Sequence, residues 1–356
     1  MNVVWFLHNL QPNGSNNTAL AYCEMLVQCG FAITVSSRDN GLLHKSFIRA
    51  GAHVELGEAS DISIKHPDIV IVNSLIRHDA MLFSKQRGLP YIVCLHENWQ
   101  AHDFNGQIHP LMRWALPNWE SMKVLLSSAA RLIFPAKFLR AAYEAFTNCE
   151  VIYNPLPPSR LQCIDYNSED REGKINLINI GSINENKNQK LAVLAADESN
   201  VVSNVSLYGE RHIRSHESEY IQELKQLGCT CTNFSLSFFP AEFPLKLTVS
   251  DRSVLIITSQ CEVLPCTIQE MMLLGVPVLA PNRFGIPEII HSEKSGILFD
   301  DYSVEDVVAG LHKLADPEIR DTVRTNAKAS ALNLFEPRRA ARQLIDCIAV
   351  AVEQHR

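Results

Sequence analysis

The sequence lacks several features that would each point to a particular class of protein. It contains no run of about 20 uncharged apolar residues, so no transmembrane helix is expected. Its opening stretch, MNVVWFLHNLQPNG, has neither a basic segment nor an apolar run of signal-peptide length, which favours a cytoplasmic protein. The net charge of −7 leaves no broad basic surface, so nucleic acid is not an expected partner.

Motifs for metal and dinucleotide binding are also missing. The ten cysteines are scattered, and Cys229 and Cys231 have no second Cys or His pair at zinc-site spacing, so no metal is expected. Scattered free cysteines are typical of the reducing cytoplasm. The missing G-x-G-x-x-G disfavours a dehydrogenase, and the missing signal peptide disfavours a periplasmic-type binding protein.

What the sequence does contain is an alternation of apolar runs and helix-length segments. The runs are continuous in Val, Ile and Leu, which is typical of parallel strands buried on both faces. Strands are expected at 2–7, 32–37, 53–57, 68–74, 91–96, 131–136 and 149–154, and again at 175–182, 205–210, 231–239, 253–259, 277–281 and 296–300. Helices are expected at 17–30, 137–147, 188–198, 215–228, 265–275, 303–315 and over most of 317–354.

A segment rich in proline and charge, 156–174, interrupts this alternation and is predicted to be a linker. A chain of 356 residues is long enough for two domains. We therefore predict an α/β protein with two doubly wound, Rossmann-like domains, 1–155 and 175–335, that face each other across a cleft. The final segment, 336–356, is expected to be a helix that packs back on the N-terminal domain.

Ligands of open α/β sheets bind outside the carboxyl ends of the strands, so the candidate site residues are those that directly follow strands. Gly14 lies in a turn, 12–15, after the first strand, and Ser15, Asn16 or Asn17 could cap the next helix. A glycine-containing loop at a helix N-terminus can hold an anion. An ordinary strand-to-helix turn would have the same sequence pattern and is the alternative.

His96 ends the fifth strand, and Glu97 and Trp99 follow it. A histidine at this place can donate a hydrogen bond to a sugar hydroxyl or a phosphate, and a tryptophan can stack on a ring. A purely structural histidine at a strand end is the alternative.

Gly181 and Ser182 end the first strand of the second half, and Lys187 stands beside the start of the next helix. A cation at a helix N-terminus is unfavourable unless an anion lies between them, so Lys187 indicates a bound phosphate. A solvated loop lysine is the alternative.

The stretch CEVLPCTIQEMMLLGVPVLAP, 261–281, carries two carboxylates, Glu262 after a strand and Glu270 more than a turn inside the next helix. Between them lie Leu264, Pro265 as the expected first residue of the helix, Cys266 and Thr267. Backbone N–H groups there suit a diphosphate, and each carboxylate can accept hydrogen bonds from vicinal hydroxyls. Taken alone, two solvated glutamates are the alternative.

Together these motifs resemble a known family. GSINENKN, EVLPCTIQE, MMLLGVPVLA, GIPEII and GILFD, in order over residues 175–300, are similar to the C-terminal half of retaining glycosyltransferases of the GT-B fold. Within that fold they resemble the group that includes bacterial polysaccharide and lipopolysaccharide glycosyltransferases, called family 4 or group 1. The N-terminal half matches only generally, through its strand–Gly-loop–helix opening, LHE and VIYNP.

The resemblance implies an enzyme that moves a sugar from a nucleotide-diphospho-sugar to a glycan or lipid-linked acceptor, with retention of configuration and with no metal or other cofactor. It implies that Glu262 holds the transferred sugar, that Glu270 holds the ribose, and that Lys187 stabilises the leaving diphosphate. His96 would reach the donor from the other domain. The remaining donor-binding positions it implies are Gly14, Gly181, Ser182, Leu264, Pro265, Cys266 and Thr267.

The chain departs from the family at several positions. The family usually has arginine at the position of Ser182 and glycines at those of Val263 and Pro265, and it has two glycines in the loop at Gly14. Weaker donor binding, an unusual donor, and a catalytically weak or inactive nucleotide-sugar-binding protein on the same fold are the alternatives left open.

One further segment, 108–125, is long, apolar and aromatic. Basic residues lie within and after it, at Arg113, Lys123, Arg131, Lys137 and Arg140. Such a surface can rest on an anionic membrane, here the inner face of the plasma membrane, where lipid-linked acceptors are presented. Core packing of a long helix is the alternative.

Overall fold

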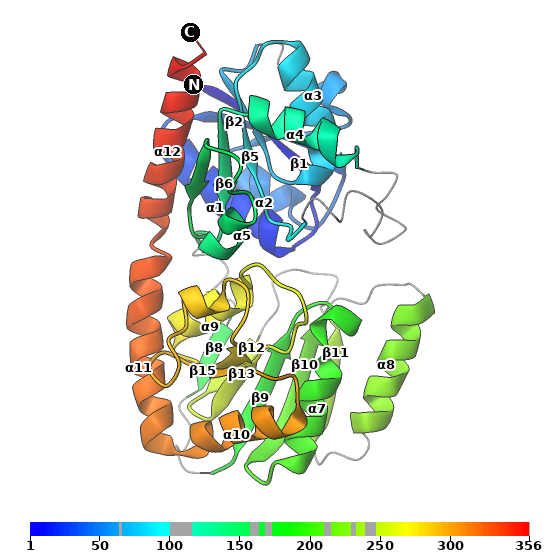
Figure 1. Cartoon of the computed structure of the whole chain (residues 1–356), viewed down its shortest axis with the longest axis vertical. Coiled ribbons are helices and arrows are strands. Elements are labelled where there is room, and N and C mark those ends of the chain that lie inside the picture. Colours follow the sequence, from blue (N-terminus) through cyan, green and yellow to red (C-terminus); the bar gives the residue numbers. More distant parts are fainter. Residues whose placement is uncertain are drawn as a thin grey trace. The chain divides into compact units, whose positions relative to one another are not determined.

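The computed structural model describes residues 1–63, 66–99, 116–156, 164–167, 173–209, 215–228, 233–238 and 247–355. The chain forms two compact units (Figure 1). Unit 1 comprises Met1–Pro157 and Phe335–Arg356, and unit 2 comprises Pro158–Leu334. Each unit contains its own parallel sheet with helices packed against it.

The sheet of unit 1 has the strand order β3-β2-β1-β4-β5-β6-β7, and all neighbours are parallel. Its strands are β1 (Asn2–Asn9), β2 (Ala32–Asp39), β3 (His53–Leu56), β4 (Ile69–Val72), β5 (Tyr91–Cys94), β6 (Arg131–Phe134) and β7 (Cys149–Val151). All seven strands expected in the first half are therefore confirmed. The central strands β4 and β5 are buried along their whole length, as their continuous apolar runs indicate.

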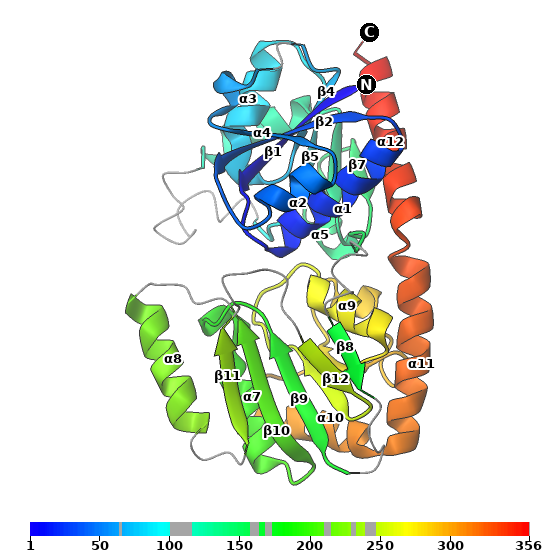
Figure 2. The same ribbon diagram turned by 180° about the vertical axis from the view of Figure 1, so that it is seen from behind.

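Helices cover both faces of this sheet. They are α1 (Gly14–Gln28), α2 (His44–Arg49), α3 (His78–Gln86), α4 (Trp119–Ser128), α5 (Lys137–Ala141) and α12 (Pro337–Glu353), with short 3₁₀ turns η1 (Ala59–Asp61) and η2 (Leu75–Arg77). Figures 1 and 2 show α1 and α2 on one face and α3 and α4 on the other. Helix α12 packs beside α1 and against β4 and β5, so the end of the chain completes the first unit.

The helix expected at 137–147 is shorter in the structure. Helix α5 ends at Ala141, and the chain continues in tight turns in which Tyr143 N–H donates to the Arg140 carbonyl. The ring of Tyr143 lies 5.3 Å from that of Phe134 and 6.0 Å from that of Phe146. These turns place the aromatic rings in the core, and the regular helix ends there.

The main sheet of unit 2 has the order β11-β10-β9-β13-β14-β15, also entirely parallel. Its strands are β9 (Ile175–Ile180), β10 (Val202–Gly209), β11 (Phe234–Phe238), β13 (Ser253–Ile256), β14 (Val278–Pro281) and β15 (Ile297–Phe299). The helices are α7 (Gln189–Glu198), α8 (Ser215–Gly228), α9 (Cys266–Leu274), α10 (Val304–Ala315) and α11 (Pro317–Leu334), with 3₁₀ turns η4 (Glu185–Lys187) and η5 (Ile286–Glu288). All six expected strands are confirmed.

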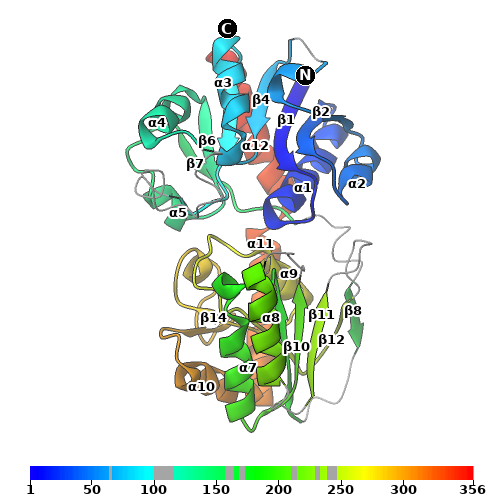
Figure 3. The same ribbon diagram turned by 90° about the vertical axis from the view of Figure 1, so that its right-hand side faces the viewer.

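Unit 2 also contains a small second sheet that the sequence did not predict. Strand β8 (Ile164–Asn167) pairs in parallel with β12 (Leu247–Ser250). Figures 2 and 3 show this pair on the face of the main sheet opposite α7. The expectation that 156–174 is only a linker was therefore wrong for the four residues of β8. Each of these strands has only four residues, including polar ones, and each pairs with a partner far away in sequence.

Candidate functional site

In unit 2, the loop after β9 is held in one conformation by its own polar side chains. The side chain of Asn184 accepts a hydrogen bond from the backbone N–H of Lys187 at 3.0 Å, which caps the turn η4. Asn188 follows with φ of 47°, a left-handed conformation that asparagine tolerates better than most residues. The backbone of Lys187 is therefore fixed beside the carboxyl end of β9.

Direct hydrogen bonds fasten this loop to the turn that follows β13. The Thr258 hydroxyl donates to the carbonyl of Lys187 at 2.9 Å, and the N–H of Gln260 donates to the carbonyl of Asn186 at 2.7 Å. The Asn186 side chain donates to the carbonyl of Cys261 at 3.1 Å. These two strands are neighbours in the sheet, so their loops form one continuous edge.

The fastened loops bring two predicted site residues into contact. The ammonium group of Lys187 forms an ion pair with the carboxylate of Glu262. The side chains are 27% and 14% exposed, respectively, so both charges are largely withdrawn from solvent. A Cβ on Gly181 would lie 3.6 Å from Lys187 Cε, which shows that the lysine stem passes over this glycine. Lys187, Glu262 and Gly181 thus lie together.

The other predicted donor residues of this segment lie in helix α9 or directly before it. Pro265 is the N-cap residue and the helix begins at Cys266, one residue later than expected, because the ψ of Pro265, 123°, is extended. Proline has no polar side chain, so no side chain at this position caps the helix. Leu264 is buried, Thr267 is half-buried in the first turn, and Glu270 is only 3% exposed. Glu270 is therefore not a solvated surface glutamate.

Ser182 contributes no charge to this edge. Its backbone carbonyl accepts a hydrogen bond from the side chain of the buried Gln189 at 2.9 Å. The Gln189 side chain in turn accepts one from the Tyr220 hydroxyl at 3.1 Å. The position where the family usually has arginine is thus occupied by a small neutral side chain.

In unit 1, His96 follows β5 at the carboxyl edge of the sheet. Burial lowers the pKa of His96 to about 4, and the neighbouring His8 adds to this effect. Burial also lowers the pKa of His8, which follows the apolar part of β1. Burial raises the pKa of Glu97, whose carboxylate accepts a hydrogen bond from the Ser74 hydroxyl. The edge therefore presents neutral imidazoles at neutral pH.

The loop with Gly14 differs from its predicted form. Gly14 is the first residue of α1, and Asn13 caps the helix by accepting a hydrogen bond from the N–H of Asn16 at 2.9 Å. The expectation that Ser15, Asn16 or Asn17 caps the helix was wrong, because the helix starts before them. Both Asn16 and Asn17 are buried, and the Asn16 side chain donates to the carbonyl of Gln11 at 2.8 Å.

Several polar atoms at this edge are buried without a hydrogen bond. Within the part of the chain that the structure describes, Nε2 of His96, Nδ1 of His8, Oδ1 of Asn16 and Nδ2 of Asn17 have no partner. Buried polar atoms are normally paired, so such a group of atoms is typical of a place where water or a ligand binds. Sequence reasoning had singled out Asn17 only as a possible helix cap, and it missed His8, because single polar residues near strand ends are common.

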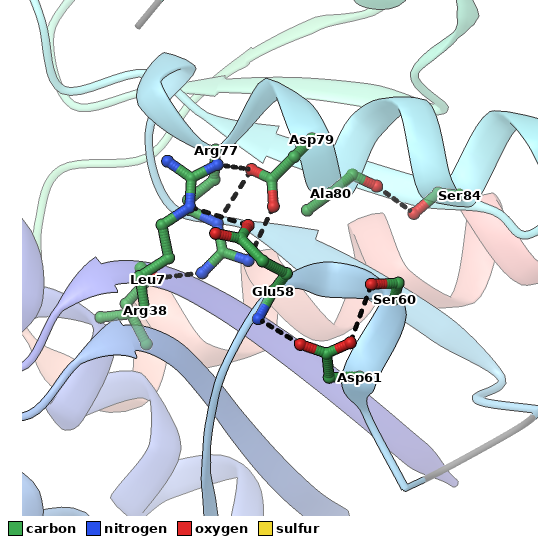
Figure 4. Close-up of polar contacts among 9 residues, drawn as sticks. All are labelled: Leu7, Arg38, Glu58, Ser60, Asp61, Arg77, Asp79, Ala80 and Ser84. Carbon is green, nitrogen blue, oxygen red and sulfur yellow. Dashed lines mark hydrogen bonds and ion pairs between the residues drawn. The ribbon is translucent and has the colours of Figure 1, made fainter.

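A charge network with the buried Arg77 at its centre supports the end of β1 (Figure 4). Arg77 is completely buried, forks onto the Asp79 carboxylate at 3.0 and 2.9 Å, and donates to the carbonyl of Leu7 at 2.7 Å. Arg38 bridges Asp79 and Glu58, each at 3.0 Å. Both arginines are thus held by carboxylates. The sequence did not predict this network, whose members come from separate elements.

The structure describes only some of the residues on which the membrane and metal expectations rest. Arg113 and most of 108–118, like Cys229 and Cys231, lie outside them. Lys123 pairs with Glu120 at 2.8 Å on the exposed side of α4, and Met122, Leu125 and Leu126 pack into the core. No group of three or more metal-ligating side chains occurs in the described ranges. Among the same residues, no helix has the length and apolar character needed to cross a bilayer.

Two parallel α/β units, each with a Rossmann-type strand order, define the GT-B architecture. Solved structures confirm the fold. HepE from Anabaena, in complex with UDP and glucose, superposes with a TM-score of 0.77 at 15% identity over 98% of this chain and 99% of HepE. Sucrose-phosphate synthase from Thermosynechococcus elongatus gives a TM-score of 0.71 at 14% identity over 97% and 98% of the two chains. The lipopolysaccharide outer core galactosyltransferase WaaB gives 0.66 at 14% identity over 96% and 99%.

The family match is confined to the second unit. Residues 165–330 match the family model described as glycosyl transferases group 1. No match is found among curated protein sequences. The resemblance to group 1 glycosyltransferases of the GT-B fold, predicted from GSINENKN and EVLPCTIQE, is thereby confirmed.

Proposed function

We propose that the protein transfers a sugar from a nucleotide-diphospho-sugar to a hydroxyl group of an acceptor, with retention of anomeric configuration and without a metal. The observation that carries this proposal is the pairing of Lys187 with Glu262 at the carboxyl edge of the unit 2 sheet, directly before α9. The family match over the same segment and the UDP and glucose bound to HepE, a protein of the same fold, support it.

Each donor group meets a side chain of suitable chemistry. The ammonium of Lys187 and the start of α9 carry positive potential for the diphosphate. Glu262 accepts hydrogen bonds from hydroxyls of the sugar, and Glu270, which is largely buried within α9, accepts them from the ribose. As the bond between sugar and phosphate breaks, negative charge grows on the leaving diphosphate, and Lys187 stabilises it there.

Proton transfer needs no enzyme base in this proposal. The acceptor hydroxyl attacks from the face that the diphosphate leaves, and an oxygen of the departing phosphate takes its proton. His96 then acts as a neutral hydrogen-bonding group toward the sugar, because burial lowers its pKa to about 4. The sites at Gly14 and Ser182 supply backbone contacts rather than charge.

The polar edge of unit 1 supports an acceptor with hydroxyl groups. His8, His96, Asn16 and Asn17 offer neutral donors and acceptors, and Arg77 is already held by Asp79. A glycan fits this chemistry better than a free anion does.

We place the reaction in the cytoplasm, at the inner face of the plasma membrane when the glycan is lipid-linked. Sedimentation with anionic liposomes tests that contact, and a protein that stays in the supernatant at low salt contradicts it.

A donor panel tests the enzyme proposal. The full-length protein is incubated with UDP-, GDP- and ADP-sugars and a glycan acceptor mixture, and the released nucleotide is measured. Wild type should release nucleotide from one class of donor. Lys187→Ala should lower kcat by about 100-fold or more and donor affinity less, because Lys187 acts mainly on charge that develops during the reaction.

A variant in the same turn gives the control. Glu185→Gln removes an exposed carboxylate from the turn that carries Lys187 and should leave kcat nearly unchanged. A fall in donor affinity with kcat unchanged in Lys187→Ala would contradict the catalytic role of this lysine.

A second function is favoured by one observation, the neutral Ser182 at the usual arginine position. In this alternative, the protein binds nucleotide sugars but does not transfer the sugar. Binding of a nucleotide sugar by calorimetry, with no nucleotide released in any donor and acceptor mixture, would establish this alternative and refute the enzyme proposal.

A further inference from the structure

The proposed function assigns Lys187 and Glu262 to different parts of the donor, yet in the structure they hold each other. Lys187 is assigned to the diphosphate and Glu262 to the sugar, and their side chains form one ion pair. Glu262 is the more enclosed partner, with 14% of its side chain exposed. A carboxylate in that position loses much of its hydration and depends on the groups around it.

The fold fastens the backbones of the loops that carry the two residues. Thr258, Gln260 and Asn186 fasten the backbones of the two loops to each other by hydrogen bonds of 2.9, 2.7 and 3.1 Å. Because the loops are fastened, only the side chains can respond to a ligand. Any anion that draws the ammonium of Lys187 away therefore does so at the expense of Glu262.

A nucleoside diphosphate and a nucleotide sugar differ in the hydrogen bonds that they can offer to Glu262. The diphosphate attracts Lys187 but offers no hydroxyl to Glu262 and brings negative charge near it. A nucleotide sugar attracts the same lysine and presents sugar hydroxyls, which can donate hydrogen bonds to the carboxylate. An unsatisfied charged group in a partly buried place costs more free energy than an exposed one.

We propose that Glu262 makes the site discriminate between the intact nucleotide sugar and the spent nucleoside diphosphate, through its ion pair with Lys187. The inference rests on the proposed function and goes beyond it, since it concerns which nucleotide the resting site prefers. When the sugar has left, Glu262 loses its hydroxyl partners and competes again for Lys187. The restored ion pair weakens the hold on the diphosphate and speeds its release.

The neutral Ser182 strengthens this effect. An arginine at that position would supply a second cation to the diphosphate, and the state of Lys187 would then matter less. With serine there, Lys187 contributes a larger part of the affinity for the diphosphate, and its ion pair with Glu262 therefore affects that affinity more. Discrimination by Glu262 is thus expected to be pronounced in this chain.

Calorimetry on the full-length protein tests the proposal with UDP and UDP-glucose, the ligands bound to HepE, and with the GDP and ADP pairs if these do not bind. Wild type should bind the nucleotide sugar more tightly than the diphosphate. Glu262→Gln, which keeps the shape but removes the charge, should bind the diphosphate about tenfold more tightly and the nucleotide sugar more weakly, a change of about 1.4 kcal/mol for the former. Glu185→Gln makes the same change of net charge in the turn that carries Lys187 and should alter neither affinity by more than about twofold.

The possible outcomes separate this inference from the proposed function. If wild type binds no nucleotide at all, the proposed function fails. If wild type binds both ligands and Glu262→Gln leaves the diphosphate affinity unchanged or lower, the discrimination proposal is wrong and the function stands. An equal gain in Glu185→Gln would show a general charge effect and would also overturn the proposal.

Discussion

His8 lies near the end of β1 and His96 follows β5, and burial lowers the pKa of each. For His96 the value falls to about 4. An unfolded chain would bind a proton at this residue near pH 6.5. Between these two values the folded protein binds fewer protons than the unfolded one, so acid pH destabilises unit 1. At neutral pH the same residue donates and accepts hydrogen bonds without carrying charge.

We predict that the His96 imidazole stays neutral down to about pH 5. Nitrogen-15 NMR of histidine side chains reports the protonation state, and the signal lost in His96→Gln identifies the residue. A midpoint for His96 close to the value of an unperturbed histidine, about 6.5, would contradict the buried environment that the structure gives it.

At the scale of residues, contacts between side chains far apart in sequence could not be predicted. Lys187 and Glu262 were each predicted as site residues from their places after strands, but their contact joins residues 75 positions apart. Arg77 gave no signal, because the carbonyl to which it donates, that of Leu7, belongs to β1, 70 positions earlier in the sequence. Local patterns indicate which residues lie at a sheet edge. The fold decides which of them touch.

At the scale of elements, the start of α1 depends on one side chain. Asn13 Oδ1 accepts hydrogen bonds from the N–H of Asn16 and the hydroxyl of Ser15, both at 2.9 Å. The first turn of a helix has N–H groups with no partner in the helix, and such a cap satisfies one of them. Since Asn16 and Asn17 sit in this turn, the cap also fixes the polar edge of unit 1.

We predict that Asn13→Ala lowers the free energy of unfolding of unit 1 by about 1 kcal/mol, within a range of roughly 0.5 to 2. Asn13→Asp keeps a cap and should restore most of this loss. All four tryptophans of the chain lie in the sequence of unit 1, at 5, 99, 114 and 119, so urea unfolding followed by tryptophan fluorescence reports this unit. If Asn13→Asp is as destabilised as Asn13→Ala, the capping interaction is not the cause.

The elements predicted from sequence were those with a local apolar pattern. Thirteen strands were predicted from such patterns, and each is present within a few residues of its expected bounds. The pair β8 and β12 was missed, since short strands with polar residues gain their stability from pairing across the sequence rather than from local pattern. The helix start at Gly14 was misplaced because several neighbouring residues can cap a helix equally well.

At the scale of the whole molecule, unit 1 is made from two separate parts of the chain. Helix α12 buries one apolar side along α1, β4 and β5, and Leu344 and Ile348 are fully buried there. The residues of α11, immediately before it, belong to unit 2. The last helix of the chain is thus a structural part of the first unit.

We predict that Leu344→Ala lowers the stability of unit 1 by about 2 to 5 kcal/mol, because it opens a cavity under α12. Leu332→Ala, the same change on α11 at a side chain that is 59% exposed, should stay within about 0.5 kcal/mol of wild type. Circular dichroism during urea unfolding, which reports both units, measures both variants. Equal effects from the two would mean that α12 does not contribute to the core of unit 1.

The divided first unit has a consequence for synthesis on the ribosome. Residues 158–334 are made after the first part of unit 1 and before α12, at roughly 5 to 20 residues per second. For at least about 9 s, therefore, the nascent unit 1 presents the apolar surfaces of α1, β4 and β5 without the helix that covers them. Unit 2 can finish folding in that time. The domain whose sequence emerges first is the one that must wait longest to be completed, and until then chaperones are needed to cover its apolar surface.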